Sequence, residues 1–214
     1  MTLPLLGRWS PLTRAYVGLL LVRIVLLIAG FGFGFRQYPN WAFLEPALGM
    51  LVGMALGLSW LHQAWARIPK PQRQAYDGQR IEPDQAVWKL FIPVYGIYWL
   101  FVANTGLCGA IERRLKRVHA RSVEVPSTLA FVACLVQFVP VLNLVLSPFL
   151  WGLFMARADA AQAEAERLDA EIVAPKSLGW LEALAILAGS LLAVWGILLV
   201  TFAALWQFLN PAKP

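Results

Sequence analysis

The feature that most constrains this chain is a series of long apolar blocks with few charges inside them. The blocks cover, approximately, residues 12–35, 41–65, 90–111, 125–156 and 178–209. Each is at least as long as the roughly 20 helical residues that cross a hydrocarbon core about 30 Å thick. Charged residues make up only 14% of the chain, against about 25% in soluble domains. The pattern predicts an all-α integral membrane protein.

The distribution of basic residues predicts how these helices are oriented. The connection between the second and third blocks holds Arg67, Lys70, Arg73, Arg80 and Lys89, whereas the turn between the first two blocks holds Arg36 alone. Because lysine- and arginine-rich connections stay in the cytoplasm, we expect a cytoplasmic N-terminus. The formal charge of +6 arises from clusters beside apolar blocks, which favours the lipid bilayer as a partner and argues against nucleic acid.

A second basic cluster conflicts with simple alternation of crossings. It directly follows the block 90–111 and contains Arg113, Arg114, Lys116, Arg117 and Arg121. A single crossing by this block would place the cluster outside the cell. Either the charge rule fails here, or the block enters and leaves the membrane on the same side.

An internal repeat favours the second option. Residues 91–97 read Phe-Ile-Pro-Val-Tyr-Gly-Ile and residues 138–144 read Phe-Val-Pro-Val-Leu-Asn-Leu, at an offset of 47 residues. Proline obstructs the preceding helical turn, and Gly and Asn best tolerate left-handed backbone angles. The repeat therefore predicts two helix breaks, which form a candidate ligand site at Pro93, Gly96, Pro140 and Asn143.

These observations divide the chain into five parts. They are an N-terminal hairpin of two spans (1–66), a polar cytoplasmic loop (67–85), a first broken-helix repeat (86–122), a second broken-helix repeat with a charged helical extension (123–174) and a C-terminal span (175–214). The predicted architecture has three full spans and two Pro-broken, re-entrant elements. Five crossing helices are the alternative.

The first break lies in a segment that resembles part of certain bacterial multi-pass inner-membrane proteins. Their pattern is an apolar run, Ile-Pro, two residues, usually Asn, then an aliphatic residue and Tyr-Trp. Here Ile92-Pro93 and Tyr98-Trp99 match this pattern, and Gly96 replaces the usual Asn. The resemblance implies a bacterial inner-membrane location and carries no activity with it.

Three polar residues fall at membrane depth: Arg23, Asn104 and Gln137. A charge at the centre of a span costs at least a few kcal/mol unless it is paired or hydrated. We expect Arg23 to be a buried tether to Glu45, to Asn104 or to carbonyls freed at the breaks, with an ion or proton pathway as the alternative. Asn104 and Gln137 are expected to bond other helices.

Small residues at fourfold spacing predict close helix packing. One such ridge is Gly49, Gly53 and Gly57, and a weaker one is Ala185, Gly189 and Ala193. Glycines on one helix face let another backbone approach closely. The partner helix belongs either to the same chain or to a neighbour.

The sequence contains no motif that predicts catalysis, a metal site or a cofactor. Cys108 and Cys134 lie apart in apolar stretches, and the two histidines, His62 and His119, fall near block ends. We therefore expect a non-catalytic membrane subunit that packs into an oligomer or a larger membrane complex. The alternative is a small transporter or channel with its site at the paired helix breaks.

Overall fold

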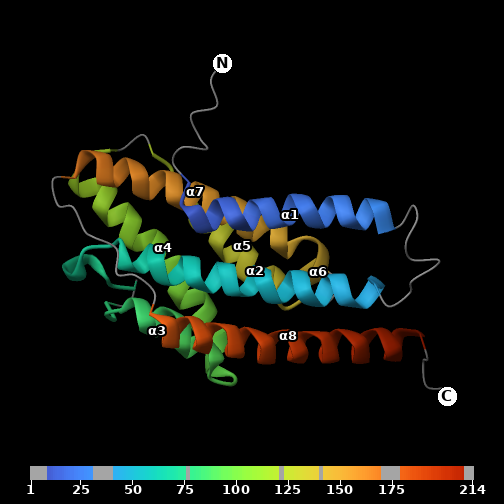
Figure 1. The fold of residues 1–214 in the computed structure, drawn as a ribbon. Helices are drawn as coiled ribbons and strands as arrows, with labels where there is room; N and C mark the ends of the chain where they lie inside the picture. Colours follow the sequence, from blue (N-terminus) through green and yellow to red (C-terminus); the bar gives the residue numbers. More distant parts are fainter. Residues whose placement is uncertain are drawn as a thin grey trace.

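The computed structural model of the chain is drawn in Figure 1, and it describes residues 9–30, 41–75, 78–120, 123–139, 142–169 and 179–209. This part of the chain is all-helical, apart from an isolated bridge between Gln74 and Arg80. The elements in order are α1 (Pro11–Ala29), α2 (Trp41–Ala66), η3 (Lys70–Gln72), α3 (Pro83–Trp88), η4 (Lys89–Phe91), α4 (Tyr95–Arg117), α5 (Ser127–Val136), α6 (Leu142–Val145), α7 (Ser147–Leu168) and α8 (Trp180–Leu209).

Among the described residues, two helices are long and apolar enough to cross a membrane by length and composition. They are α1 and the segment Ala47–Ala66 of α2. Helix α1 starts with a side-chain cap, because the Ser10 hydroxyl accepts a hydrogen bond from the Thr13 backbone N–H and Pro11 occupies the first helical position. The helix α5 and the segment Trp180–Gly196 of α8 are shorter apolar helices.

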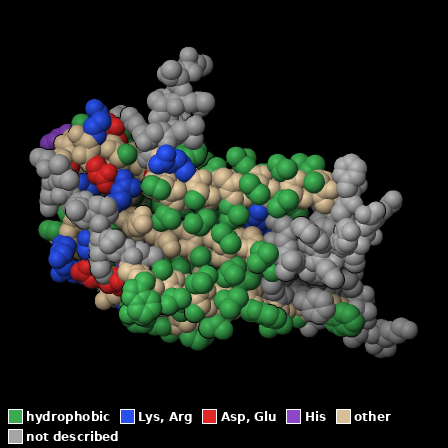
Figure 2. Space-filling model, viewed as in Figure 1, with side chains coloured by type: hydrophobic (Ala, Val, Ile, Leu, Met, Phe, Trp, Pro, Cys, Tyr) green, Lys and Arg blue, Asp and Glu red, His purple; other side chains and the backbone are tan. Residues whose placement is uncertain are grey.

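The helices form a bundle with one charged end. Helices α1, α2 and α8 lie side by side as three long rods, with α2 packed against both of the others (Figure 1). Of the other helices, α3, α4 and α7 lie toward the end where α1 and α8 begin and α2 stops. Figure 2 shows that acidic and basic side chains collect at this end and that hydrophobic side chains cover the rods beyond it. We call it the charged end.

The charged end brings the two basic segments of the sequence into contact. Arg113 near the end of α4 donates hydrogen bonds to the backbone carbonyls of Gln72 and Gln74, and Arg114 donates one to the carbonyl of Arg67 at 3.0 Å. Much of the segment 67–82 is buried: Ile68 and Ile81 have no exposed surface. The segment predicted as a polar loop is therefore a packed part of the fold.

Both predicted helix breaks occur. The first separates η4 from α4, and the second lies between α5 and α6, so that α4 and α6 start 47 residues apart at Tyr95 and Leu142. The backbone reason expected for the first break is wrong, because the left-handed angle belongs to Val94, with φ 62°, and not to Gly96. A Cβ on Gly96 would lie 2.2 Å from the Leu90 carbonyl oxygen, so glycine is needed there for close approach.

A buried carboxylate ties three helices together at the charged end. Asp159 of α7 has no exposed surface and accepts hydrogen bonds from the Ser10 backbone N–H (2.7 Å), the Thr13 hydroxyl (2.6 Å), the Trp60 indole N–H (3.0 Å) and the Arg67 guanidinium (3.2 Å). Burial lowers the pKa of Arg67, but hydrogen bonds and charge from Glu166 and Asp159 outweigh it, and the net pKa is raised.

Candidate functional site

A cavity of about 400 Å³ lies between the rods and the two broken-helix elements. Its lining comes from α1, α2, η4, α4, the α5 to α7 region and one residue of α8. This volume falls within the range of about 300–1,000 Å³ typical of small-molecule sites. Most of the lining is apolar, with a few polar side chains among Leu, Met and aromatic residues.

Most of the residues singled out in the sequence line this cavity. The lining includes Gly96 and Asn143 of the break site. It includes all three intramembrane polar residues, Arg23, Asn104 and Gln137. It also includes four residues of the two small-residue ridges: Gly49, Gly53, Gly57 and Ala193. Pro93, Ala185 and Gly189 are not part of the lining, and Pro140 lies outside the described residues. Residues from all five apolar blocks thus converge on one space.

The glycines of α2 contact their own chain. A Cβ on Gly49 would lie 2.3 Å from Nε of Arg23, so the arginine side chain crosses this glycine. A Cβ on Gly53 would touch Tyr16 of α1 at 3.7 Å, and one on Gly57 would have nothing within 4 Å. Gly49 and Gly53 therefore lie against α1 of the same chain. Gly57 opens onto the cavity.

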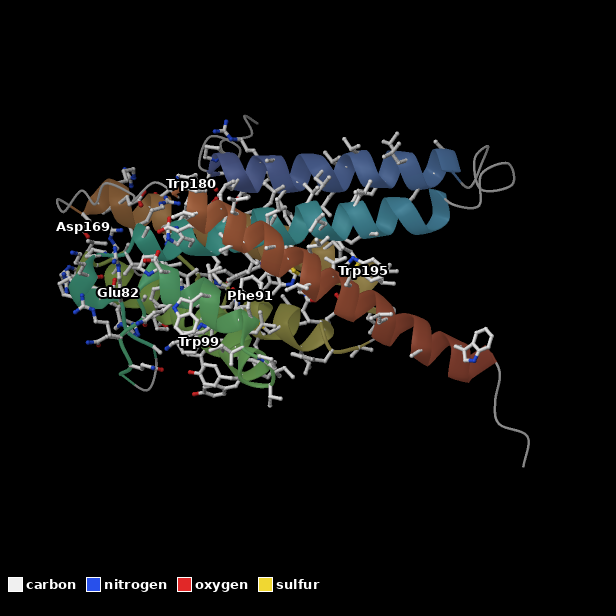
Figure 3. All side chains as sticks on the ribbon, turned by 60° about the horizontal axis from the view of Figure 1, so that its bottom comes forward. Glu82, Phe91, Trp99, Asp169, Trp180 and Trp195 are labelled. Carbon is white, nitrogen blue, oxygen red and sulfur yellow. The ribbon has the colours of Figure 1, made fainter. Side chains whose placement is uncertain are left out.

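The weaker ridge of α8 divides among three environments. A Cβ on Gly189 would lie 2.4 Å from the ring of Phe91, which projects toward α8 (Figure 3). Ala193 lines the cavity, and Ala185 is exposed. This ridge therefore lets η4 approach α8 at Gly189 and closes one side of the cavity at Ala193.

Two polar atoms in the lining are buried without a hydrogen-bond partner. The Asn104 side chain is 1% exposed, and its Nδ2 donates to the Leu100 carbonyl at 2.8 Å, while its Oδ1 has no partner. The indole Nε1 of Trp151 is also buried and unpartnered. Such atoms cost about 1–3 kcal/mol each unless something bonds to them. Both residues line the cavity, and each has one buried polar atom without a partner among the described residues.

Arg23 was expected to be a buried tether. Arg23 and Asn104 both line the cavity, whereas the side chain of Glu45 is outside the described part of the structure. Arg23 is the one formally charged side chain among the described lining residues. In a low-dielectric space its positive charge acts more strongly on a ligand than it would in water.

Trp151 was not singled out in the sequence. Its ring packs edge-on against Phe154, with centroids 5.7 Å apart, and the residue lines the cavity. A tryptophan near the middle of an apolar block was the available signal, because a buried Trp N–H usually finds a partner.

Comparison of the chain with protein-family models, curated proteins and solved structures finds no match. The resemblance of the segment around Ile92-Pro93 to bacterial inner-membrane proteins therefore stays a prediction. The function has to be argued from the residues of this chain.

Proposed function

We propose that this chain is a non-catalytic, multi-pass membrane protein of the small-transporter type, which binds an amphipathic anion in the cavity between the two helix breaks. The observation that carries the proposal is the pair of buried, unpartnered polar atoms, Oδ1 of Asn104 and Nε1 of Trp151, in residues of a mostly apolar wall. A fold gains nothing from leaving such atoms unpaired. A ligand that bonds to both recovers what their burial costs.

The lining indicates the chemistry of the ligand. The positive charge of Arg23 favours an acidic group such as a carboxylate or phosphate. The indole N–H of Trp151 can donate to an oxygen of that group, and the Asn104 amide can accept from a hydroxyl or N–H beside it. The Leu, Met and Phe side chains of the wall suit an attached alkyl or aromatic part.

A matched pair of glycine substitutions tests the site. Gly57→Leu projects a side chain into the cavity, whereas Gly18→Leu adds the same side chain to an exposed position of α1, and neither position has an atom within 4 Å of the new Cβ. In mild detergent, native mass spectrometry should show decanoate bound to the wild type and to Gly18→Leu. Gly57→Leu should bind at least about tenfold more weakly, which corresponds to about 1.4 kcal/mol.

Two results would contradict the proposal. One is equal binding of decanoate by both leucine variants, which would place the bound molecule elsewhere. The other is equal binding of decanoate and uncharged decanol by the wild type, which would remove the role of the acidic group.

The same proposal places the chain in a bacterial inner membrane with its charged end in the cytoplasm. The segment 67–89 and the end of α4 contact each other at the charged end. Both basic segments then lie on the same side of the membrane, which fits three full spans (α1, α2 and α8) and two re-entrant elements. Lysine and arginine at that end suit the cytoplasmic face. The N-terminus would then be cytoplasmic and the C-terminus external.

Single-cysteine labelling of intact cells tests this topology in a background carrying Cys108→Ala and Cys134→Ala. Gln79→Cys and Arg117→Cys, both exposed at the charged end, should resist a membrane-impermeant reagent until the cells are opened. Gln37→Cys, between the first two spans, should react from outside. Reaction of Arg117→Cys from outside, with Gln79→Cys protected, would mean that the block 90–111 crosses.

A packing subunit of an oligomer or a larger complex is the second candidate. Gly18 of α1 and Gly196 of α8 are exposed, and a Cβ on either would meet nothing within 4 Å, so each offers a small outward surface for another helix. The native mass measurement also tests this candidate. A strictly monomeric particle with no partner would count against it and would leave the cavity proposal standing.

A further inference from the structure

Three potential metal ligands from distant parts of the sequence meet near the charged end. They are His62 in the last turns of α2, Asp84 in the first turn of α3 and Glu182 in the first turn of α8. The Nε2 atom of His62 lies 2.8 Å from Oδ1 of Asp84, and one ligand atom from each of the three residues lies within 4.8 Å of the other two. None of the sequence motifs pointed to this cluster, because its members are 22 and 98 residues apart.

The two carboxylates also make structural contacts. Asp84 bonds to the imidazole, and Oε2 of Glu182 accepts a hydrogen bond from the Gly179 backbone N–H at 2.6 Å. A carboxylate oxygen of each residue nevertheless lies close to one of the other. Two carboxylates this close repel, and a nearby cation relieves the repulsion.

The imidazole of His62 faces the cluster. His62 is 2% exposed, and its Nε2 lies against Asp84, whereas its Nδ1 has no hydrogen-bond partner. With the proton on Nδ1, the lone pair of Nε2 points into the cluster. Glu182 lies in the first turn of α8, where the helix dipole stabilises its negative charge.

We propose that His62, Asp84 and Glu182 bind a divalent cation of the zinc type, which fastens α8 to α2 and α3. One imidazole nitrogen and two carboxylate oxygens are a donor set that suits Zn²⁺, with a fourth position left for water. Zinc lies about 2.0–2.2 Å from such ligands, so the partly exposed Glu182 side chain closes on the ion by a rotation about its own bonds. The site is independent of the cavity.

Isothermal titration of the purified full-length chain in detergent with Zn²⁺ tests the site, in the background with Cys108→Ala and Cys134→Ala so that thiols do not compete. The expected result is one Zn²⁺ per chain and little response to Mg²⁺. Loss of a contact that only supports a metal ligand weakens metal binding by roughly 10- to 100-fold. Glu182→Gln and Asp84→Asn each remove a proposed ligand, so each should weaken Zn²⁺ binding by more than this.

Glu112→Gln is the matched control, because it removes one carboxylate charge from an exposed pair with Lys116 and should bind Zn²⁺ as the parent does. Thermal unfolding gives a readout beyond binding: Zn²⁺ should raise the midpoint of the parent chain and of Glu112→Gln but not that of Glu182→Gln. No Zn²⁺ binding by the parent chain, or equal binding by Glu182→Gln and Glu112→Gln, would overturn the proposal.

Discussion

The surroundings of Asp159 and the cavity wall treat buried polar groups in opposite ways. Asp159 accepts four hydrogen bonds, two from α1 and its N-cap, one from α2 and one from Arg67 just after α2. At the cavity, Asn104 bonds only to a carbonyl of its own helix, and Oδ1 of Asn104 and Nε1 of Trp151 bond to nothing in the described structure. A saturated polar group holds a fold together, whereas an unsatisfied one beside a cavity calls for an explanation, and a bound ligand is the one that we propose.

The largest effect should come from removing the saturated carboxylate. Asp159→Ala leaves the Arg67 guanidinium and the Trp60 and Thr13 donors without their shared acceptor, and we expect the free energy of unfolding to fall by about 3–5 kcal/mol. Denaturant unfolding in detergent micelles measures it. The control Glu112→Ala, in an exposed pair with Lys116, should lose no more than about 1 kcal/mol. Equal losses in the two variants would show that the Asp159 network is not structural.

A smaller effect is expected where the first break needs a close backbone approach. Gly96→Ala puts a methyl group against the Leu90 carbonyl, so the free energy of unfolding should fall by about 1–3 kcal/mol. Gly18→Ala, in open space on α1, should instead be neutral or raise it by up to about 1 kcal/mol through helix propensity. If Gly96→Ala were as stable as Gly18→Ala in the same unfolding experiment, the geometry of this break would be wrong.

Gly49→Ala should separate binding from stability. Its methyl group displaces a flexible side chain, that of Arg23, and no backbone atom. We expect the free energy of unfolding to change by less than about 1 kcal/mol, while decanoate affinity falls because the positive charge moves. Titration with decanoate and denaturant unfolding of the same preparation measure both quantities. Unchanged affinity would remove Arg23 from the proposed ligand contacts.

The helices were predictable because they follow from local patterns. The apolar block 41–65 corresponds closely to α2 (Trp41–Ala66), and the block 178–209 to α8 (Trp180–Leu209). The two breaks were also readable, since proline within an apolar repeat acts through its immediate neighbours. The sequence did not reveal that Val94 adopts the left-handed angle, because β-branched residues rarely adopt it.

The sites depend on pairings that no local pattern encodes. The cavity residues were recognised singly, as glycines, break residues and polar groups at membrane depth, but their convergence depends on how α1, α2, α4 and α7 pack. The meeting of His62 with Glu182 likewise depends on the packing of α8 against α2. Thr13 and Asp159, 146 residues apart, gave no hint of their hydrogen bond.

The proposed ligand site depends most directly on Asn104. One substitution at this residue, measured in two ways, tests the site. Asn104→Leu keeps the size of the side chain and removes the unpartnered oxygen, so the ligand-free protein should be as stable as the wild type or more stable, by up to about 1–2 kcal/mol. Its affinity for decanoate should fall by at least about tenfold, or 1.4 kcal/mol. A variant that is clearly less stable, yet binds decanoate as the wild type does, would show that Asn104 serves the fold and would contradict the proposed site.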